Sequence, residues 1–339
     1  MIIYLSYLIS ATTLIFILIF KDHLIFKDRN SIQDFHKKPT SRFGGLVVIF
    51  GLLYALFFFK EHSLNEFFIA TLPILLIGLF EDIGLQIKPI IRLLAMCLSV
   101  AIVYFLMDIG IYSLNIEFAD SLLANPLINF MFTLLVLVGL INSVNIIDGL
   151  NGLMLGFSLM VFLALAYVAW QIGDAFLVDL YLLIAGSIFI LFIANFPFGK
   201  VFTGDMGAYF IGLVMGVTGL LLGIRNEEVS HWFILLLVLY PLYETVFSIY
   251  RRRRNYQINA MLPDTNHLHS LIFKKITRQR CFAKNPNICN AMTSVIIWVF
   301  ALISITPAIV FYKDQNILIS YAFFYMFLYT LMYKKIENI

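Results

Sequence analysis

Asp205 stands at a junction between two apolar runs, 177–194 and 208–222, in a short segment rich in helix-breaking residues. Gly204 and Gly207 beside it let the backbone come close to a ligand, and a carboxylate at a membrane surface suits a divalent cation that carries phosphates. The segment therefore predicts a metal–phosphate site. A polar turn between two helices, with an ordinary loop carboxylate, is the competing interpretation.

A pair of adjacent carboxylates, Glu81 and Asp82, follows another apolar run, and two cations, Lys88 and Arg92, come close behind. Neighbouring carboxylates that face cations can orient a metal or accept a proton. The helix macrodipole disfavours acidic residues near a helix C-terminus, so helix capping does not account for the pair. We interpret both carboxylates as part of a reactive site, against the alternative of a structural turn.

The segment 142–152 is dense in amides between two further apolar runs. Asn145 and Asp148 are three residues apart, which places them on one face if the segment is helical, and Asn151 follows among glycine turn signals. Amide oxygens suit both a hard cation and a hydrogen bond to a base or an acetamido group. A plain turn accounts for the glycines, but not for the amides and the carboxylate together.

Basic side chains gather in two places of this sequence. The first is His36 with Arg42, leading into a Gly-Gly pair that opens a helix, where a phosphate could bind; affinity for anionic lipid is the alternative. The second is His267 with His269, downstream of the arginine run 251–254, which is typical of a stop-transfer anchor. Zinc would require further ligands, which do not stand nearby, so donation to a pyrophosphate is the favoured interpretation.

These groups are embedded in a chain of 339 residues that is 61% hydrophobic and 13% charged. A water-soluble domain carries roughly a quarter charged residues, so we expect an all-α, polytopic membrane bundle. Taking roughly 17–25 apolar residues per crossing, the sequence predicts eleven helices. Their approximate ranges are 2–20, 43–59, 67–80, 91–107, 127–143, 152–170, 177–194, 208–224, 232–249, 291–311 and 317–333. The first lacks a basic segment before it and a small-residue cleavage site after it, so we expect a retained helix rather than a signal peptide.

Lysine and arginine are divided unequally between the two sides of the predicted membrane topology. One side receives 20 of the 23 basic residues, which places it in the cytoplasm, with the N-terminus outside and the C-terminus inside. We expect residues 1–339 to form a single transmembrane domain whose active-site face is made by five cytoplasmic loops, 21–42, 81–92, 144–151, 195–206 and 250–290. Three cysteines without Cys-x-x-Cys spacing predict neither a disulfide framework nor a zinc site.

Taken together, these stretches resemble the polyprenyl-phosphate N-acetylhexosamine-1-phosphate transferase family, which includes the bacterial muramoyl-pentapeptide transferase and the undecaprenyl-phosphate GlcNAc-1-phosphate transferases. The matching segments occur in the family's order, at 42–45, 81–82, 145–152, 195–205 and 267–269. The resemblance implies that a sugar-1-phosphate moves from a UDP-sugar to undecaprenyl phosphate, with UMP as the second product. It also implies Mg²⁺ as cofactor, with Mn²⁺ as a substitute, and a multi-pass protein of the bacterial inner membrane whose active site faces the cytoplasm.

The resemblance, together with the basic side chains around the matching segments, assigns roles to residues. Catalytic roles fall on Asp82, Glu81 and Asp205, and metal binding falls on Asp205 and Asn145. Contacts to the nucleotide sugar fall on Asp148, Asn151, Asn195 and Lys200. Binding of pyrophosphate or lipid phosphate falls on His267, His269, Lys88, Arg42 and His36. The family pair is usually Asp-Asp with an Asp or Asn three residues further on, whereas this chain has Glu81 and Leu85, so Asp82 carries more weight than Glu81.

Two routes stay open for Asp82, which either orients the acceptor or takes its last proton, or forms a covalent phospho-enzyme. A different class, a transporter or flippase of a lipid-linked sugar, would place polar residues at mid-span and break helices in matching halves, whereas here the polar residues crowd one face. The expected partners are a UDP-sugar, undecaprenyl phosphate and the lipid bilayer, with no nucleic acid, and a homodimer stays open. The transferred sugar and its pathway also stay open, although the simple-sugar branch is favoured over muramoyl-pentapeptide.

Overall fold

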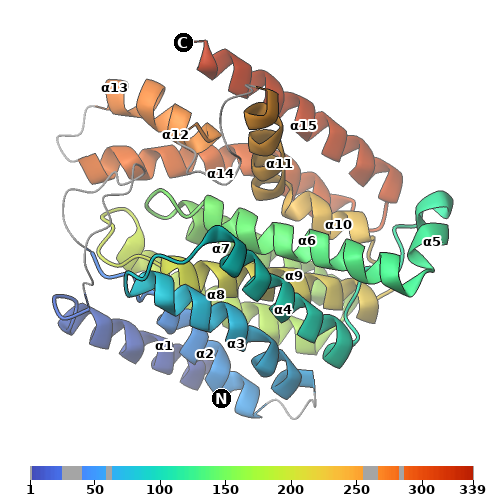
Figure 1. Cartoon of the computed structure of the whole chain (residues 1–339), viewed down its shortest axis with the longest axis horizontal. Helices are drawn as coiled ribbons and strands as arrows, with labels where there is room; N and C mark the ends of the chain where they lie inside the picture. Colours follow the sequence, from blue (N-terminus) through green and yellow to red (C-terminus); the bar gives the residue numbers. More distant parts are fainter. Residues whose placement is uncertain (1, 25–39, 59–62, 255–265, 282–285, 339) are drawn as a thin grey trace.

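The computed structural model describes residues 2–24, 40–58, 63–254, 266–281 and 286–338. The apolar runs become helices because a chain surrounded by lipid has to satisfy its backbone hydrogen bonds internally, and within these residues all regular structure is helical (Figure 1). In chain order the helices are α1 (Ile2–Ile19), α2 (Gly45–Phe58), α3 (Ser63–Asp82), α4 (Pro89–Met107), α5 (Glu117–Leu123), α6 (Pro126–Ile146), α7 (Leu153–Ile172), α8 (Ala175–Asn195), α9 (Gly204–Arg225), α10 (His231–Leu237), α11 (Leu239–Arg254), α12 (Leu268–Ile272), the π-helical turn η1 (Phe273–Thr277), α13 (Arg278–Arg280), α14 (Pro286–Val310) and α15 (Gln315–Glu337).

Eight of the described helices are long and apolar enough to cross a membrane. Helices α10 and α11, bent by 70° at their junction, add a ninth crossing if the pair is one broken span, and α2 is apolar but shorter. Each of the eleven predicted spans falls on a helix, and the span predicted at 232–249 is the broken one. The helical, polytopic class is therefore confirmed, while the count of eleven crossings and their direction stay predictions.

Helix α9 is buried along almost its whole length and packs against α2, α3, α6 and α7. Helices in lipid associate through close packing, for which small residues at the contact are needed. A Cβ added to Gly212 would lie 2.8 Å from the Cα of Ile141 on α6, and one added to Gly207 would lie 2.5 Å from the Cα of Gly45 on α2. The N-terminal turns of α9 are therefore held in a fixed place by several neighbours.

Three backbone hydrogen bonds join the segment before α9 to the segment before α2. The N–H groups of Gly44 and Gly45 donate to the carbonyls of Phe202 (2.9 Å) and Thr203 (2.8 Å), and the N–H of Phe202 donates to the Ser41 carbonyl (2.9 Å). The Gly-Gly pair, for which phosphate binding was one interpretation, thus uses its N–H groups in this contact. The beginnings of α2 and α9 are consequently fixed to each other.

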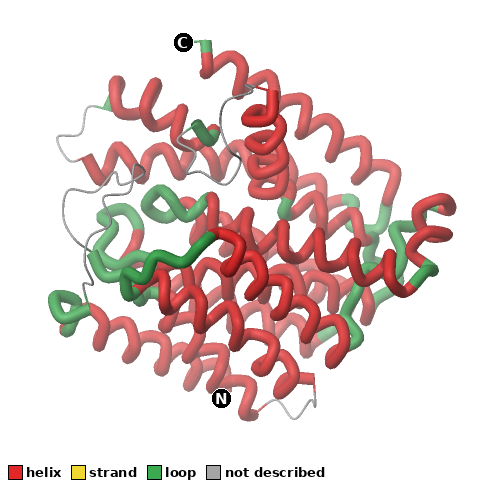
Figure 2. The backbone as a smooth tube through the Cα atoms, in the orientation of Figure 1, coloured by secondary structure: helices red, strands yellow, loops and turns green. Residues whose placement is uncertain are grey.

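The loops that follow α3, α6 and α8 gather at one end of the bundle, on the left in Figure 2. Two buried asparagines connect two of these loops. Asn151 Nδ2 donates to the Pro197 carbonyl (2.8 Å), and Asn195 Oδ1 accepts the N–H of Gly152 (2.6 Å). Asn195 also donates through Nδ2 to the carbonyl of Val201 (2.8 Å). Three of the predicted cytoplasmic loops therefore lie together, and hydrogen bonds join the loop after α6 to the loop after α8.

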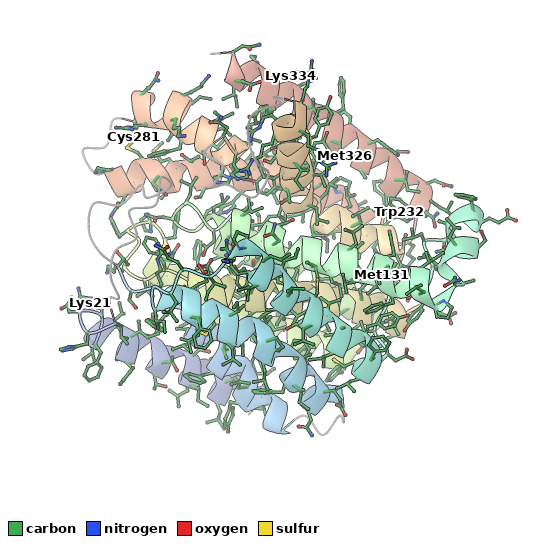
Figure 3. All side chains as sticks on the ribbon, in the orientation of Figure 1. Lys21, Met131, Trp232, Cys281, Met326 and Lys334 are labelled. Atoms are coloured by element: carbon green, nitrogen blue, oxygen red, sulfur yellow. A yellow bond between two sulfur atoms is a disulfide. The ribbon has the colours of Figure 1, made fainter. Side chains whose placement is uncertain are left out.

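The two ends of the bundle carry different polar groups. Lys21 lies at the end where these loops gather, and Trp232 lies at the opposite end (Figure 3). Near the Trp232 end, Arg225 pairs with Asp174, with 2.9 Å between Nε and Oδ2. Exposed pairs of this kind contribute little stability, and the chemistry predicted from sequence belongs to the other end.

Cys281 and Cys289 are joined by a disulfide, with Cα atoms 5.7 Å apart, a distance within the usual range. The bond ties the residue after α13 to the first turns of α14. The expectation that no disulfide follows from the cysteine spacing was wrong for this pair. The spacing of two cysteines eight positions apart does not by itself say whether they pair.

Candidate active site

Asp82, the last residue of α3, lies against the first turn of α9. Its Oδ1 accepts the backbone N–H of Asp205 (2.8 Å), and its Oδ2 accepts that of Met206 (3.1 Å). The first N–H groups of a helix lack partners within the helix and carry partial positive charge, so a carboxylate is stabilised there. From sequence, capping was excluded only for the helix that Asp82 ends. The structure corrects this, since Asp82 caps a different helix.

Gly204 allows Asp82 to approach α9 this closely. Its φ angle is +76°, a conformation that strains residues with a side chain. A Cβ at this position would also lie 2.1 Å from the carbonyl oxygen of Arg42 and 2.6 Å from Oδ2 of Asp82. Both backbone conformation and space therefore require glycine directly before Asp205.

Glu81, the other half of the acidic pair, contacts the loop after α3. Its Oε1 accepts the N–H of Ile87 (2.9 Å), and its Oε2 lies 3.9 Å from Nη1 of Arg92. Glu81 is buried, whereas Lys88, a predicted phosphate-binding residue, is exposed on the same loop. Leu85, where the family has a polar residue, is 50% exposed and offers no polar atom. Glu81 therefore supports the loop that carries Lys88.

The two predicted metal ligands, Asn145 and Asp205, are in direct contact. Asn145 lies in the last turn of α6 and Asp205 in the first turn of α9, and the Asn145 Nδ2 donates to Oδ1 of Asp205 at 2.8 Å. Both side chains are partly exposed. An amide carries an acceptor oxygen beside its donor nitrogen. If the Asn145 side-chain amide rotated by half a turn, its Oδ1 and Oδ1 of Asp205 could both face one cation.

Asp148 lies in the turn after α6, and the pKa of its carboxyl is raised to about 7. Burial is the largest cause, because a low-dielectric surrounding penalises the charged form, and the negative charge of Asp205 adds to it. The positive charge of Arg42 opposes both effects. Asp148 is therefore coupled electrostatically to Asp205 and Arg42, and a bound cation would favour its ionised form.

The chemistry of this donor set fits a magnesium ion. No three His, Cys, Asp or Glu side chains of the described residues come together in a group that could hold a metal. Mg²⁺ sites that handle phosphates are usually made from one or two carboxylates, water and the phosphates themselves. Asp205, Asn145 and the ionisable Asp148 offer oxygen ligands of that type at one place.

Asn151 and Asn195, predicted to contact the nucleotide sugar, are buried, and their side-chain hydrogen bonds join two of the loops. The backbone N–H of Asn151 donates to Oδ1 of Asn290 (2.7 Å), and its carbonyl accepts the hydroxyl of Ser294 (2.8 Å). The role of Asn290 in holding Asn151 was not predicted from sequence. The only sequence signal for it was the position of an amide at the edge of an apolar run. Lys200, also predicted to contact the nucleotide sugar, is exposed on the loop that Asn195 anchors.

His267 and His269 are buried and stack on each other, with ring centroids 5.4 Å apart and planes inclined by 5°. A Cβ built on Gly149, the neighbour of Asp148, would lie 3.4 Å from Nε2 of His269. The histidine pair therefore lies beside the loop that carries Asp148, as the common site predicted from sequence requires. His36, the remaining predicted phosphate-binding residue, lies outside the described residues.

Glu244 in α11 was missed by the sequence analysis. It is fully buried, and its carboxylate lies 3.0 Å from Nδ1 of His267. A single carboxylate within the apolar run 232–249 was the signal that could have found it, because carboxylates in membrane segments are costly and usually have a specific partner.

Fold and site together define a polytopic helical membrane protein with acidic, amide and imidazole groups converging at one end of its bundle. Residues 64–223, which include Asp82, Asn145, Asp148 and Asp205, match the sequence profile of Glycosyl transferase family 4. This stretch is just under half of the chain, and its match supports the resemblance to the polyprenyl-phosphate N-acetylhexosamine-1-phosphate transferases.

Three relatives show the range of activities among similar proteins. A probable undecaprenyl-phosphate N-acetylglucosaminyl 1-phosphate transferase of Bacillus subtilis is 27% identical over 250 residues, 71% of this chain and 68% of its own length. An undecaprenyl-phosphate alpha-N-acetylglucosaminyl 1-phosphate transferase of Thermotoga maritima is 28% identical over 255 residues, 74% of both chains. A phospho-N-acetylmuramoyl-pentapeptide-transferase of Borrelia turicatae is 29% identical over 233 residues, 59% of this chain and 66% of its own length.

Proposed function

We propose that this protein transfers a sugar-1-phosphate, of N-acetylhexosamine type, from a UDP-sugar to undecaprenyl phosphate at the start of a cell-envelope glycan. The observation that carries the proposal is the contact between Asn145 and Asp205 on a helix start capped by Asp82, with Asp148 and the histidine pair beside it. The two relatives named as N-acetylglucosaminyl 1-phosphate transferases each align with about seven-tenths of the chain. They support the simple-sugar branch.

In the proposed reaction, an oxygen of the lipid phosphate forms a bond to the β-phosphorus of the UDP-sugar, and the bond between that phosphorus and the bridging oxygen breaks. UMP leaves with the bridging oxygen and its electron pair. The second pKa of a phosphate monoester is about 6, so the lipid phosphate is mostly a dianion near neutral pH and needs little activation. The protein mainly has to position the two phosphates in line and offset their charge.

Mg²⁺, or Mn²⁺ in its place, would be held by Asp205 and Asn145 and would supply positive charge to the diphosphate. Arg42 adds a fixed positive charge near Asp148, and His267 and His269 present imidazoles to the same region. Lys88 and Lys200 are exposed cations on the neighbouring loops and are suited to attract anionic substrates. The site thus combines acidic and amide groups that could bind a cation with basic side chains that could bind phosphates.

Asp82 is proposed to organise this site rather than to form a bond to phosphorus. Both of its carboxylate oxygens accept N–H groups of α9, and phosphorylation of either oxygen would disturb the hydrogen bond that this oxygen accepts. In this account UMP is released only when a lipid acceptor is present. The competing phospho-enzyme route predicts release of UMP by the wild-type protein without any lipid, in a manner that depends on Asp82.

The site is proposed to face the cytoplasm of a bacterial inner membrane. The loops that carry it receive most of the lysine and arginine of the sequence, which favours the cytoplasmic side. A transporter would use broken helices in matching halves, and the described helices contain one such break, between α10 and α11. The enzyme assignment therefore accounts for more of the structure.

The test is to incubate membranes containing the protein with undecaprenyl phosphate and, separately, UDP-GlcNAc, UDP-GalNAc and their 6-deoxy relatives, each radiolabelled in the sugar. We expect label from one donor to enter the lipid fraction in step with UMP release. Membranes from cells with an empty vector provide the background. Labelled lipid at background for every donor would contradict the proposal.

A further inference from the structure

Glu244 is a buried carboxylate with a complete set of donors. Its Oε1 lies 3.0 Å from Nδ1 of His267 and accepts the N–H of Leu268 at 3.1 Å, and its Oε2 accepts the hydroxyl of Tyr329 at 2.8 Å. A carboxylate buried away from water is retained only where such partners compensate its lost hydration. The side chain is therefore held in one orientation by α12 and α15.

The contact with Glu244 determines the protonation of the His267 ring. Because a carboxylate accepts, Nδ1 of His267 has to carry the hydrogen, and the hydroxyl of Ser248 lies 3.2 Å from the same nitrogen. Once Nδ1 is protonated, a proton on Nε2 makes the ring a cation, and the negative charge of Glu244 stabilises this cation. An imidazolium can donate a charge-assisted hydrogen bond to a phosphate oxygen.

His267 lies between Glu244 and the candidate active site. His267 stacks on His269 at 5.4 Å, and His269 lies against Gly149, next to Asp148. Three phenols also surround Glu244: Tyr329, which donates to it, and Tyr240 and Tyr325, whose hydroxyls have no hydrogen-bond partner within the described residues.

We propose that Glu244 is a positioning residue, which fixes the His267 ring and keeps its proton on Nδ1, so that the ring meets an anionic phosphate oxygen of the substrates as a cation. This inference rests on the proposed function for the identity of the phosphates. Its structural alternative is that Glu244 only caps the start of α12 through the N–H of Leu268.

Glu244→Gln and Tyr329→Phe separate the two roles. The Gln side chain can still accept the N–H of Leu268 but carries no charge to stabilise a protonated ring. Tyr329→Phe is the matched control, because it removes a hydrogen bond from the same carboxylate and leaves the contact with His267 in place. For Glu244→Gln we expect kcat/KM for transfer to fall by about ten- to hundredfold, as for other residues that orient a functional histidine. Tyr329→Phe should lower the melting temperature with little change in kcat/KM per folded molecule.

Ring ¹⁵N spectra of histidine-labelled protein provide a readout that does not depend on turnover, with the His267 signals assigned by His267→Gln. We expect the wild-type His267 to hold its proton on Nδ1, as its contact with Glu244 requires, and this preference to be lost in Glu244→Gln. Unchanged His267 signals and an unchanged pH profile of kcat/KM in Glu244→Gln would overturn the inference, even if the melting temperature fell. Absence of transfer by the wild-type protein would instead contradict the proposed function, and the ring ¹⁵N spectra would still decide whether Glu244 controls the position of the proton on His267.

Discussion

Asp82 accepts the backbone N–H of Asp205 at 2.8 Å across 123 positions of sequence, so the acidic end of α3 and the start of α9 form one unit. The carboxylate that caps the helix and the carboxylate proposed to hold the cation are thereby kept in a fixed relation. A site built on the ends of packed helices is held more rigidly than one built on free loops. Each part of this unit can be altered separately by substitution.

Asp82→Ala removes both acceptors from the first turn of α9 and should cost about 0.5–2 kcal/mol of stability, as the loss of a helix cap does. Transfer activity per folded molecule should fall as well, because Asp205 loses its fixed position. Asp82→Asn keeps one acceptor oxygen and should lie between wild type and Asp82→Ala in both properties. Thermal unfolding and transfer rates measured on the same detergent preparations check this order.

A radiolabel experiment examines the competing route for Asp82. The wild-type protein is incubated with UDP-sugar labelled at the β-phosphorus, without lipid acceptor, and is then denatured and separated. We expect no label on the protein. Label on the wild-type protein that disappears in Asp82→Asn would contradict the organising role and establish the phospho-enzyme.

Asp205→Asn should reduce transfer by about a hundredfold or more, since the charge stabilisation that a bound metal supplies is worth several kcal/mol. Asn145→Ala keeps the carboxylate and removes the partner amide, so it should instead raise the Mg²⁺ concentration needed for half-maximal rate. Titration of the rate with Mg²⁺ in both variants distinguishes these effects. An unchanged Mg²⁺ requirement in Asn145→Ala would exclude the amide from the cation site.

Gly204→Ala and Gly173→Ala form a matched pair of glycine substitutions. Both positions have left-handed backbone, with φ of +76° and +82°, but a Cβ at Gly204 would meet Arg42 and Asp82, while a Cβ at Gly173 would have no atom within 4 Å. Gly173→Ala should therefore show only the backbone strain, of roughly 1–3 kcal/mol, with normal activity per folded molecule. Gly204→Ala should lose activity in addition, and equal activity of the two variants would contradict the close packing around Asp205.

Asp148 should make the stability of the wild-type protein depend on pH. Its pKa is about 7 in the folded protein and about 3.9 in an unfolded chain, so the folded state binds the proton more tightly. Stability from this group is complete below pH 4 and is lost as pH rises toward 7. Asp148→Asn has no carboxyl to ionise and should not show this loss. Between pH 5 and 7, its melting temperature relative to that of the wild type should therefore rise, as measured without Mg²⁺. Parallel pH curves for the two proteins would show that Asp148 titrates normally.

The helices and the polar loops could be predicted from sequence because both leave local patterns. The apolar run before Glu81 and the glycines around Asp205 mark their places without knowledge of the fold. The structure brings Asn145 into direct contact with Asp205 and places His269 beside Gly149, while metal binding by the first pair stays a prediction.

What the sequence did not reveal depends on contacts between distant segments. Asp82 caps a helix that begins far away in the chain, and no pattern around Asp82 identifies its partner. Asn151 and Asn195 were predicted to contact the nucleotide sugar from the family resemblance, and no sequence pattern indicated that Asn151 Nδ2 and Asn195 Oδ1 each bond a backbone group of the other residue's loop. Glu244 was overlooked since its partner, His267, lies across a long connection.

The most direct test of the central claim is the formation of lipid-linked sugar by the purified protein, with undecaprenyl phosphate and the donor selected in membranes. It is measured with Mg²⁺, with a chelator, and after Mg²⁺ is restored. Asp179→Asn, which neutralises an exposed carboxylate on α8, is the control for Asp205→Asn. The account predicts that the product disappears with chelator, returns with Mg²⁺, forms normally in Asp179→Asn and is nearly absent in Asp205→Asn. Product that forms equally well in Asp205→Asn, or in the presence of the chelator, would contradict it.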